Sequence, residues 1–263
     1  MTAFRALLKK ELATLFASPL AYLALTLVML VTALIFFDHL RIYNQILFLY
    51  ASSSMGGFES DTVPDHINVR DSVFFPVLET LGITLIALIP VITMRVFSEE
   101  RARGTDELLL TLQLSPTQIV LAKFLVTYGF VVLMMAGSFV YPAMATVQGG
   151  IGAQHLLAVF LGLSLHALGL ASLGLVCSAF SASQLVAAVA SWALGFVLWD
   201  FAWASAFVNE GVGRVLDLIS MHPRYGSFAE GIVNLEHFAY FAGLAGVSLA
   251  LARFSFDWRR VAG

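Results

Sequence analysis

The chain has 263 residues, of which 59% are hydrophobic and only 12% are charged, and its mean hydropathy is +0.88. An ordinary soluble domain carries about 25% charged residues, so this composition excludes that class and predicts an integral membrane protein. The net charge of −3 argues against nucleic-acid binding, which requires a basic face. The single cysteine, Cys177, excludes an intramolecular disulfide, and no Cys/His spacing indicates a metal site.

The N-terminal segment 1–18 predicts an amphipathic helix that lies in the membrane interface. Its leucines and phenylalanines recur at helical spacing, whereas its basic residues take other positions. Ser18-Pro19 ends this helix, because proline is tolerated at the first position of the next one. Glu11 departs from the pattern and points into the apolar arc. Two interpretations stay open: Glu11 pairs with Arg101 or Arg103, or its carboxylate reaches the lipid headgroups.

Six apolar stretches are candidates to cross a bilayer as helices, which takes about 20 residues each. They cover residues 19–37, 74–94, 124–146, 156–180, 184–208 and 238–252. The expected fold is therefore all-α, a single transmembrane domain (1–263) with six transmembrane helices. Glycine and serine residues within 156–180 indicate close packing of that helix against its neighbours.

The distribution of lysine and arginine predicts the orientation of the chain. With both termini in the cytoplasm, ten of the 14 basic residues lie inside and four lie outside, which is the positive-inside pattern. The ten inner residues are Arg5, Lys9, Lys10, Arg95, Arg101, Arg103, Lys123, Arg253, Arg259 and Arg260. The four outer residues are Arg41, Arg70, Arg214 and Arg224.

A charged segment, 98–117, separates the second and third apolar stretches. It begins with four charged side chains, Glu99, Glu100, Arg101 and Arg103. Gly104 follows them and predicts the end of the helix that comes from the second stretch.

A second short helix is predicted between Gly104 and Pro116, within the same segment. Ser115-Pro116 ends it and begins the third spanning helix, again because a cap residue precedes a proline. Thr105 is a suitable N-cap, and Glu107 lies near the positive end of the helix dipole. Leu108, Leu109 and Leu112 form an apolar stripe along it. This stripe favours docking onto another protein, and the alternative is a solvated turn.

The residues around this segment resemble those of ABC-2 type transporter permeases. The resemblance rests on Pro90-Val91-Ile92-Thr93-Met94-Arg95, Ser98-Glu99-Glu100-Arg101, Gly104-Thr105, Glu107-Leu108-Leu109 and Ile119-Val120-Leu121-Ala122-Lys123. A second patch resembles the gliding-motility-type branch of that family. It comprises His222-Pro223-Arg224-Tyr225, Phe228, Gly231 and Tyr240-Phe241.

The resemblance implies a non-catalytic permease of a bacterial inner membrane. Segment 98–117 would be the coupling helix, seated in a groove of a cytoplasmic P-loop ATPase that binds ATP and Mg²⁺, so that this chain itself binds no cofactor. A second permease copy would complete a homodimer, and some relatives add an accessory membrane protein with a large extracytoplasmic domain. Segment 209–237 would form short re-entrant helices at the outer face. Its gate residues would be His222, Pro223, Arg224, Tyr225, Phe228 and Gly231.

Other functional classes are weighed by the motifs that they require. The chain has no Walker sequence, no HExxH and no GxSxG, so ATP hydrolysis requires another chain and no intramembrane enzyme is indicated. A proton-coupled secondary transporter using Glu79, His166 and Asp200 is the alternative, since ionisable residues in apolar runs are candidate functional sites. A membrane scaffold that transmits force and moves no substrate is a further reading.

Overall fold

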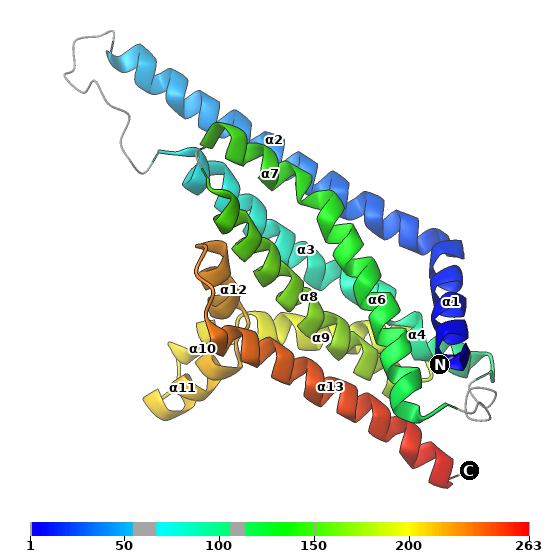
Figure 1. The fold of residues 1–263 in the computed structure, drawn as a ribbon. Coiled ribbons are helices and arrows are strands. Elements are labelled where there is room, and N and C mark those ends of the chain that lie inside the picture. Colours follow the sequence, from blue (N-terminus) through cyan, green and yellow to red (C-terminus); the bar gives the residue numbers. More distant parts are fainter. Residues whose placement is uncertain (1, 55–66, 106–113, 150, 263) are drawn as a thin grey trace.

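The computed structural model describes residues 2–54, 67–105, 114–149 and 151–262, and these ranges form a bundle of helices (Figure 1). In chain order the elements are α1 (Thr2–Ala17), α2 (Pro19–Ser54), a short π-helix η1 (Arg70–Phe74), α3 (Phe75–Thr93), α4 (Arg95–Ala102), α6 (Pro116–Ser138), α7 (Val140–Gly149), α8 (Ala153–Phe180), α9 (Gln184–Trp199), α10 (Ala202–Ser205), α11 (Glu210–Ile219), α12 (His222–Ala229) and α13 (Leu235–Ala262).

Helix α8 is the central element, because it packs against α3, α4, α6, α9, α12 and α13. Both chain termini, α4 and the start of α6 lie at one end of the bundle, which we call the termini end (Figure 1). Helices α7 and α10–α12 and the last turns of α2 lie away from it, at the far end (Figure 1). The predicted all-helical fold is confirmed for the described residues.

Within the described ranges, five helical segments are long and apolar enough to cross a membrane. They are Pro19–Ser52, Arg70–Ala102, Pro116–Met144, Ala153–Phe180 and Leu235–Trp258. The predicted span at 184–208 is too long, since α9 ends at Trp199 after 16 residues, or about 24 Å. That length is less than the roughly 30 Å of a hydrocarbon core, so the sixth span is not established by length.

Two hydrogen bonds from residues that follow α11 account for the early end of α9. The carbonyl of Leu198 accepts the backbone N–H of Met221 (2.8 Å), and the carbonyl of Trp199 accepts the Ser220 hydroxyl (3.0 Å). These two bonds satisfy carbonyls that a longer helix would have used.

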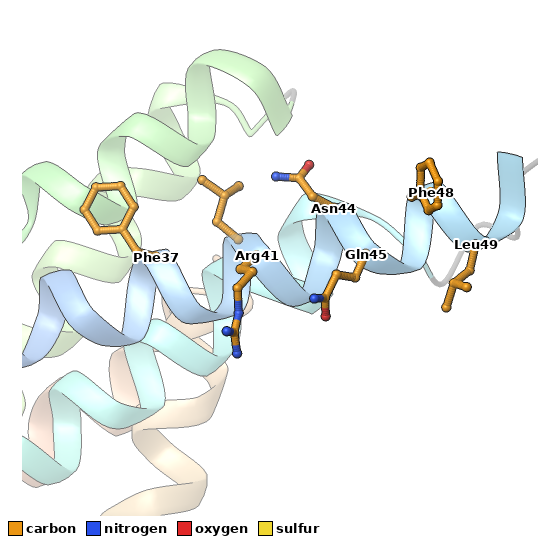
Figure 2. A pocket seen from close by; sticks show the side chains of 7 residues that line it. Phe37, Arg41, Asn44, Gln45, Phe48 and Leu49 are labelled. Carbon is orange, nitrogen blue, oxygen red and sulfur yellow. The ribbon is translucent and has the colours of Figure 1, made fainter. Parts of the chain in front are cut away.

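Helix α2 continues well beyond the predicted boundary at residue 37. It has 36 residues and is therefore about 54 Å long, whereas a hydrocarbon core is about 30 Å thick. Hydropathy falls at Asp38 because the chain becomes polar, but no proline or glycine interrupts the helix before Ser54. A pocket lies on the C-terminal half of α2, and Figure 2 shows its lining side chains, which among the described residues all come from α2.

Two predicted helix starts are present in the structure. Helix α1 ends at Ala17 and α2 begins at Pro19, as the Ser18-Pro19 pair indicates. Helix α6 begins at Pro116, well before the predicted span 124–146, with Ser115 and Gln118 forming a capping box.

Glycines of α8 allow close contact with neighbouring helices, as their spacing predicts. A Cβ at Gly174 would lie 2.1 Å from Thr93 Oγ1 of α3, and a Cβ at Gly162 would lie 2.3 Å from Phe228 Cβ of α12. Side chains larger than hydrogen would force these helices apart.

Candidate functional site

The connection between α3 and α4 is a break in the helix at Met94. The Ser178 hydroxyl of α8 accepts hydrogen bonds from the backbone N–H groups of Phe97 (3.0 Å) and Ser98 (3.1 Å). It also donates to the carbonyl of Met94 (3.0 Å). In an uninterrupted helix the Phe97 N–H would bond to the carbonyl of Thr93, four residues earlier, but α4 begins only at Arg95, after its N-cap Met94. A hydroxyl from another helix therefore replaces part of the helical hydrogen-bond ladder, and α4 is attached to α8 rather than simply continuing α3.

Helix α4 ends in a left-handed glycine, as the sequence predicts. Gly104 has φ = +66°, and its N–H donates to the carbonyl of Arg101 (3.1 Å), while Thr105 N–H donates to Glu100 (2.9 Å). This pair of bonds is a Schellman motif, in which glycine avoids the strain that a Cβ would cause. The chain is thus turned sharply just before the 106–113 segment.

Two of the predicted coupling arginines have defined partners. Arg101 donates to the carbonyl of Ala179 at the end of α8, which adds a second α4–α8 link. Arg103 pairs with Glu99 one turn earlier, at 2.6 Å, and its side chain remains 69% exposed. Of these two arginines, Arg101 joins α4 to another helix, whereas Arg103 and its partner Glu99 face the surface.

An ion cluster joins α1, α4 and α6 at the termini end. Lys123 of α6 lies 3.1 Å from Glu11 Oε1 and 2.9 Å from Glu100 Oε2, and its side chain is only 1% exposed. The third donor position of the Lys123 ammonium is used by the carbonyl of Val96 (2.9 Å). Lys10 completes the cluster, 3.0 Å from Glu11 and 2.7 Å from Glu100.

The charges of this cluster determine the protonation of Lys10. Burial lowers the pKa of Lys10, but the hydrogen bonds and charges of Glu100 and Glu11 outweigh it, so that the pKa is raised overall. A raised folded-state pKa adds stability that is complete below the unfolded value and is lost only as the pH rises through the folded one. Lys10 is therefore charged at neutral pH.

The cluster corrects the predicted partner of Glu11. Glu11 binds Lys123 and Lys10 and does not bind Arg101 or Arg103. The expected link between α1 and the segment 98–117 exists, but it runs through Lys123, which binds both Glu11 and Glu100. Sequence reasoning missed this role, although Lys123 falls on the helical face of Ile119, Val120 and Thr127, which are all buried.

Part of the predicted coupling segment lies outside the described residues. These residues are Glu107, Leu108, Leu109 and Leu112, and the short helix expected there stays a prediction. The structure places Glu99, Glu100, Arg101, Arg103, Gly104 and Thr105 on α4 and the turn that follows it.

The predicted gate residues of the far end gather on α12. Tyr225 is 2% exposed and donates its hydroxyl to the carbonyl of Leu78 on α3 (2.7 Å). Burial raises the pKa of the Tyr225 hydroxyl, which therefore remains a neutral donor. His222, next to Pro223 at the start of the helix, lies 3.5 Å from Glu79 of α3.

Arg224 closes the turn between α11 and α12. Its Nη1 donates to the carbonyls of Asp217 (2.9 Å) and Ser220 (2.5 Å), and its guanidinium lies 4.2 Å from the centre of the Tyr240 ring of α13. The arginine is 8% exposed, so its guanidinium contacts these carbonyls and the Tyr240 ring and not solvent.

Phe228 and Gly231 make the closest contacts of the far-end segment with α8. Phe228 is fully buried on Gly162. Gly231 has φ = +86°, and a Cβ there would lie 2.4 Å from His155 Nδ1. A glycine is required at this position both by the backbone conformation and by the contact.

The three residues of the proton-coupled alternative do not form one chain. His166 is fully buried between the rings of Trp199 (4.8 Å) and Tyr225 (5.6 Å), whereas Asp200 is exposed. Among the described residues no hydrogen bond or ion pair joins any two of Glu79, His166 and Asp200.

Sequence comparison assigns the chain to a family. A search of curated proteins finds no match. The model of the family described as ABC-2 family transporter protein matches residues 57–222, which is more than half of the chain. This range contains the α3–α4 break, α4, the buried Lys123, α8 and α9, that is, most of the site described above. The chain therefore belongs to the ABC-2 transporter family.

Proposed function

We propose that this chain is the transmembrane permease subunit of an ATP-driven exporter or force-transmitting complex, energised by a separate cytoplasmic ATPase. Chains of this family are generally non-catalytic membrane subunits that work with such an ATPase. The observation that carries the proposal is the attachment of α4. Ser178 and Arg101 tie α4 to the central helix α8, and Lys123 ties it to α1 and α6.

These attachments explain how a push on segment 98–117 would reach the bundle. Packed elements move as bodies, so displacement of the turn after Gly104 would shift α4 together with the ends of α8, α6 and α1. The far-end segment 209–237 packs on α3, α8 and α13, and it would be the gate that responds. The gate residues would be those of α12 and Gly231.

The proposed assembly places ATP and Mg²⁺ on the ATPase and pairs this chain with a second copy of itself. The termini end would face the cytoplasm of a bacterium with the chain in its inner membrane, because ten of the 14 basic residues lie at that end. The patch from His222 to Phe241 supports the gliding-motility-type branch, in which an accessory membrane protein with a large extracytoplasmic domain would join the complex.

The orientation is tested by labelling single cysteines in intact cells. Cys177, which is buried, is replaced by alanine, and a cysteine is introduced at Lys9 or at Arg214. A membrane-impermeant maleimide should label the Arg214 site in intact cells and the Lys9 site only after lysis. Labelling of Lys9 in intact cells would contradict the proposed orientation.

The partner is tested by purifying the tagged chain from its native membrane in mild detergent. A P-loop ATPase at about one copy per permease should co-purify. Leu109→Asp should lose it while the bundle stays folded, and the control Leu218→Asp, at an exposed leucine of α11, should retain it. Equal recovery of the ATPase with both variants would refute docking through the 98–117 segment.

Charge reversal at a predicted coupling residue, as in Glu100→Lys, is not a suitable test of docking. Glu100 is an acceptor for both Lys123 and Lys10, so a lysine at position 100 would bring three cations together. Loss of the partner in that variant would report unfolding of the termini end as well as loss of docking.

A further inference from the structure

A cleft of about 850 Å³ lies at the termini end. Its walls are α1, the first turn of α2, the α3–α4 break and α6. Ligand sites in proteins commonly occupy about 300–1,000 Å³, so the cleft is large enough for part of an organic molecule.

One half of the cleft carries charged side chains with an excess of positive charge. The cations are Lys10, Arg95, Arg103 and Lys123, and the carboxylates are Glu11, Glu99 and Glu100. Arg103 is paired with Glu99, and the two lysines are paired with Glu11 and Glu100. Among the described residues no carboxylate pairs with Arg95, which therefore carries the excess charge.

The guanidinium of Arg95 has unused hydrogen-bond donors. Its Nη1 donates to the Ser18 hydroxyl (3.0 Å), and its Nε is buried without a hydrogen-bond partner. A guanidinium has five N–H donors and recognises phosphate through two parallel bonds. Arg95 thus lines the cleft with a charge that no carboxylate of the described residues balances and with a buried donor that has no partner.

The other half of the cleft is apolar. It is formed by Leu15, Leu20, Ala21, Ile92 and Val126. Arg95 lies two residues after Thr93, the last residue of the apolar helix α3, so the charged and apolar halves meet at the depth where the apolar part of the segment Arg70–Ala102 ends. Phospholipid phosphates occupy this depth, and basic pockets between membrane helices recognise anionic headgroups.

We propose that this cleft binds one anionic phospholipid, with its phosphate on Arg95 and part of its acyl chains against Leu20, Ile92 and Val126. The apolar half favours a lipid over a free phosphate compound, which would leave these side chains uncovered. The bound lipid would fill the space between the entry helix α1 and the bundle. This proposal goes beyond the role of the chain as a permease, and it is tested on the purified chain alone.

Native mass spectrometry of the purified chain, titrated with dioleoyl phosphatidylglycerol or dioleoyl phosphatidylcholine, measures the binding. The chain should bind the anionic lipid more tightly. Arg95→Gln should weaken binding of the anionic lipid by about tenfold, the effect of losing one charge-assisted contact, and should leave the neutral lipid unaffected. Arg5→Gln removes an exposed cation of the same end that does not line the cleft, and it should bind as the unmodified chain does.

A second variant tests the apolar half independently of the charge. Leu20→Trp retains Arg95 and fills part of the cleft, so it should weaken binding of the anionic lipid, and it carries the test if Arg95→Gln does not fold. Equal affinity for the two lipids, or an equal loss with Arg5→Gln and Arg95→Gln, would overturn the proposal. Glycerophosphoglycerol is the headgroup without acyl chains. If it competes with the lipid at equal concentration, the site recognises a free phosphate compound, and the proposed phospholipid ligand is wrong.

Discussion

Replacing Lys123 by methionine removes the cation that Glu11 and Glu100 share. The two carboxylate oxygens lie 3.1 and 2.9 Å from Nζ, and the lysine side chain is 1% exposed. Breaking a buried ion pair by deleting one partner costs about 3–5 kcal/mol. Because the carboxylates are 13% and 16% exposed and Lys10 still contacts both, we expect the lower figure, about 3 kcal/mol.

Thermal unfolding in detergent, followed by circular dichroism, measures this loss. A stability change of this size corresponds to a decrease of roughly 6–12 °C in Tm for a chain of this length. Lys9→Met, at an exposed lysine of the same entry helix, is the matched control and should leave Tm within about 1 °C, since exposed substitutions have small effects.

A combined variant separates charge from packing. Lys123→Met together with Glu11→Gln and Glu100→Gln removes both carboxylates as well as the cation, so it should recover at least half of the lost Tm, because neutral replacement of a whole buried ion cluster is often tolerated. The reasoning is wrong if Lys123→Met melts like the unmodified chain, or if the combined variant melts as low as the single one.

Three further predictions concern helix contacts, each measured by thermal unfolding in detergent. Ser178→Ala removes the hydroxyl that accepts from two amide N–H groups of α4 and donates to the Met94 carbonyl, and it should cost about 2 kcal/mol. Ser164→Ala loses only a bond within α8 and should cost less; equal losses would contradict the α3–α4 break. Gly162→Ala places a methyl group 2.3 Å from the α12 phenylalanine and should cost about 1–3 kcal/mol. Its control, Gly129→Ala, meets nothing within 4 Å and should stabilise its helix by about 0.5–1 kcal/mol. If Gly162→Ala does not change the stability, α12 does not pack on Gly162. Tyr225→Phe loses its bond to an α3 carbonyl (2.7 Å) and should cost about 1 kcal/mol; no change would mean that this bond is absent.

The sequence predicted the helix starts better than the helix ends. Ser18-Pro19 and Ser115-Pro116 are local signals, because a cap and a proline act within one turn, and both are helix starts in the structure. The ends at residues 37 and 208 were taken from hydropathy, which reports membrane thickness and not hydrogen bonding. Helix α2 continues to Ser54 because no proline or glycine interrupts it. Helix α9 ends at Trp199, where Ser220 and Met221, far along the chain, donate hydrogen bonds to its last carbonyls.

The candidate site was predicted in outline but not in its connections. Gly104 was readable because a left-handed turn after a helix strongly favours glycine, and the structure has it there. The partner of Glu11 was not readable, since Lys123 is 112 residues away and only packing of α1 against α6 brings them together. The helical face of Lys123 was available from the sequence and would have indicated a buried cation in need of carboxylates. The role of Ser178 had no such signal, because it depends on how α8 crosses the α3–α4 break.

Crosslinking in native membranes tests most directly whether an ATPase grips this chain at its charged segment. A photoreactive amino acid is placed at Leu109 or, as a control, at Val215 on the exposed face of α11, and the crosslinked proteins are identified by mass spectrometry. The account predicts that a P-loop ATPase is captured from position 109 and not from position 215. Capture of that ATPase from position 215, or of no ATPase from position 109 while the tagged chain is crosslinked to other proteins there, would contradict it.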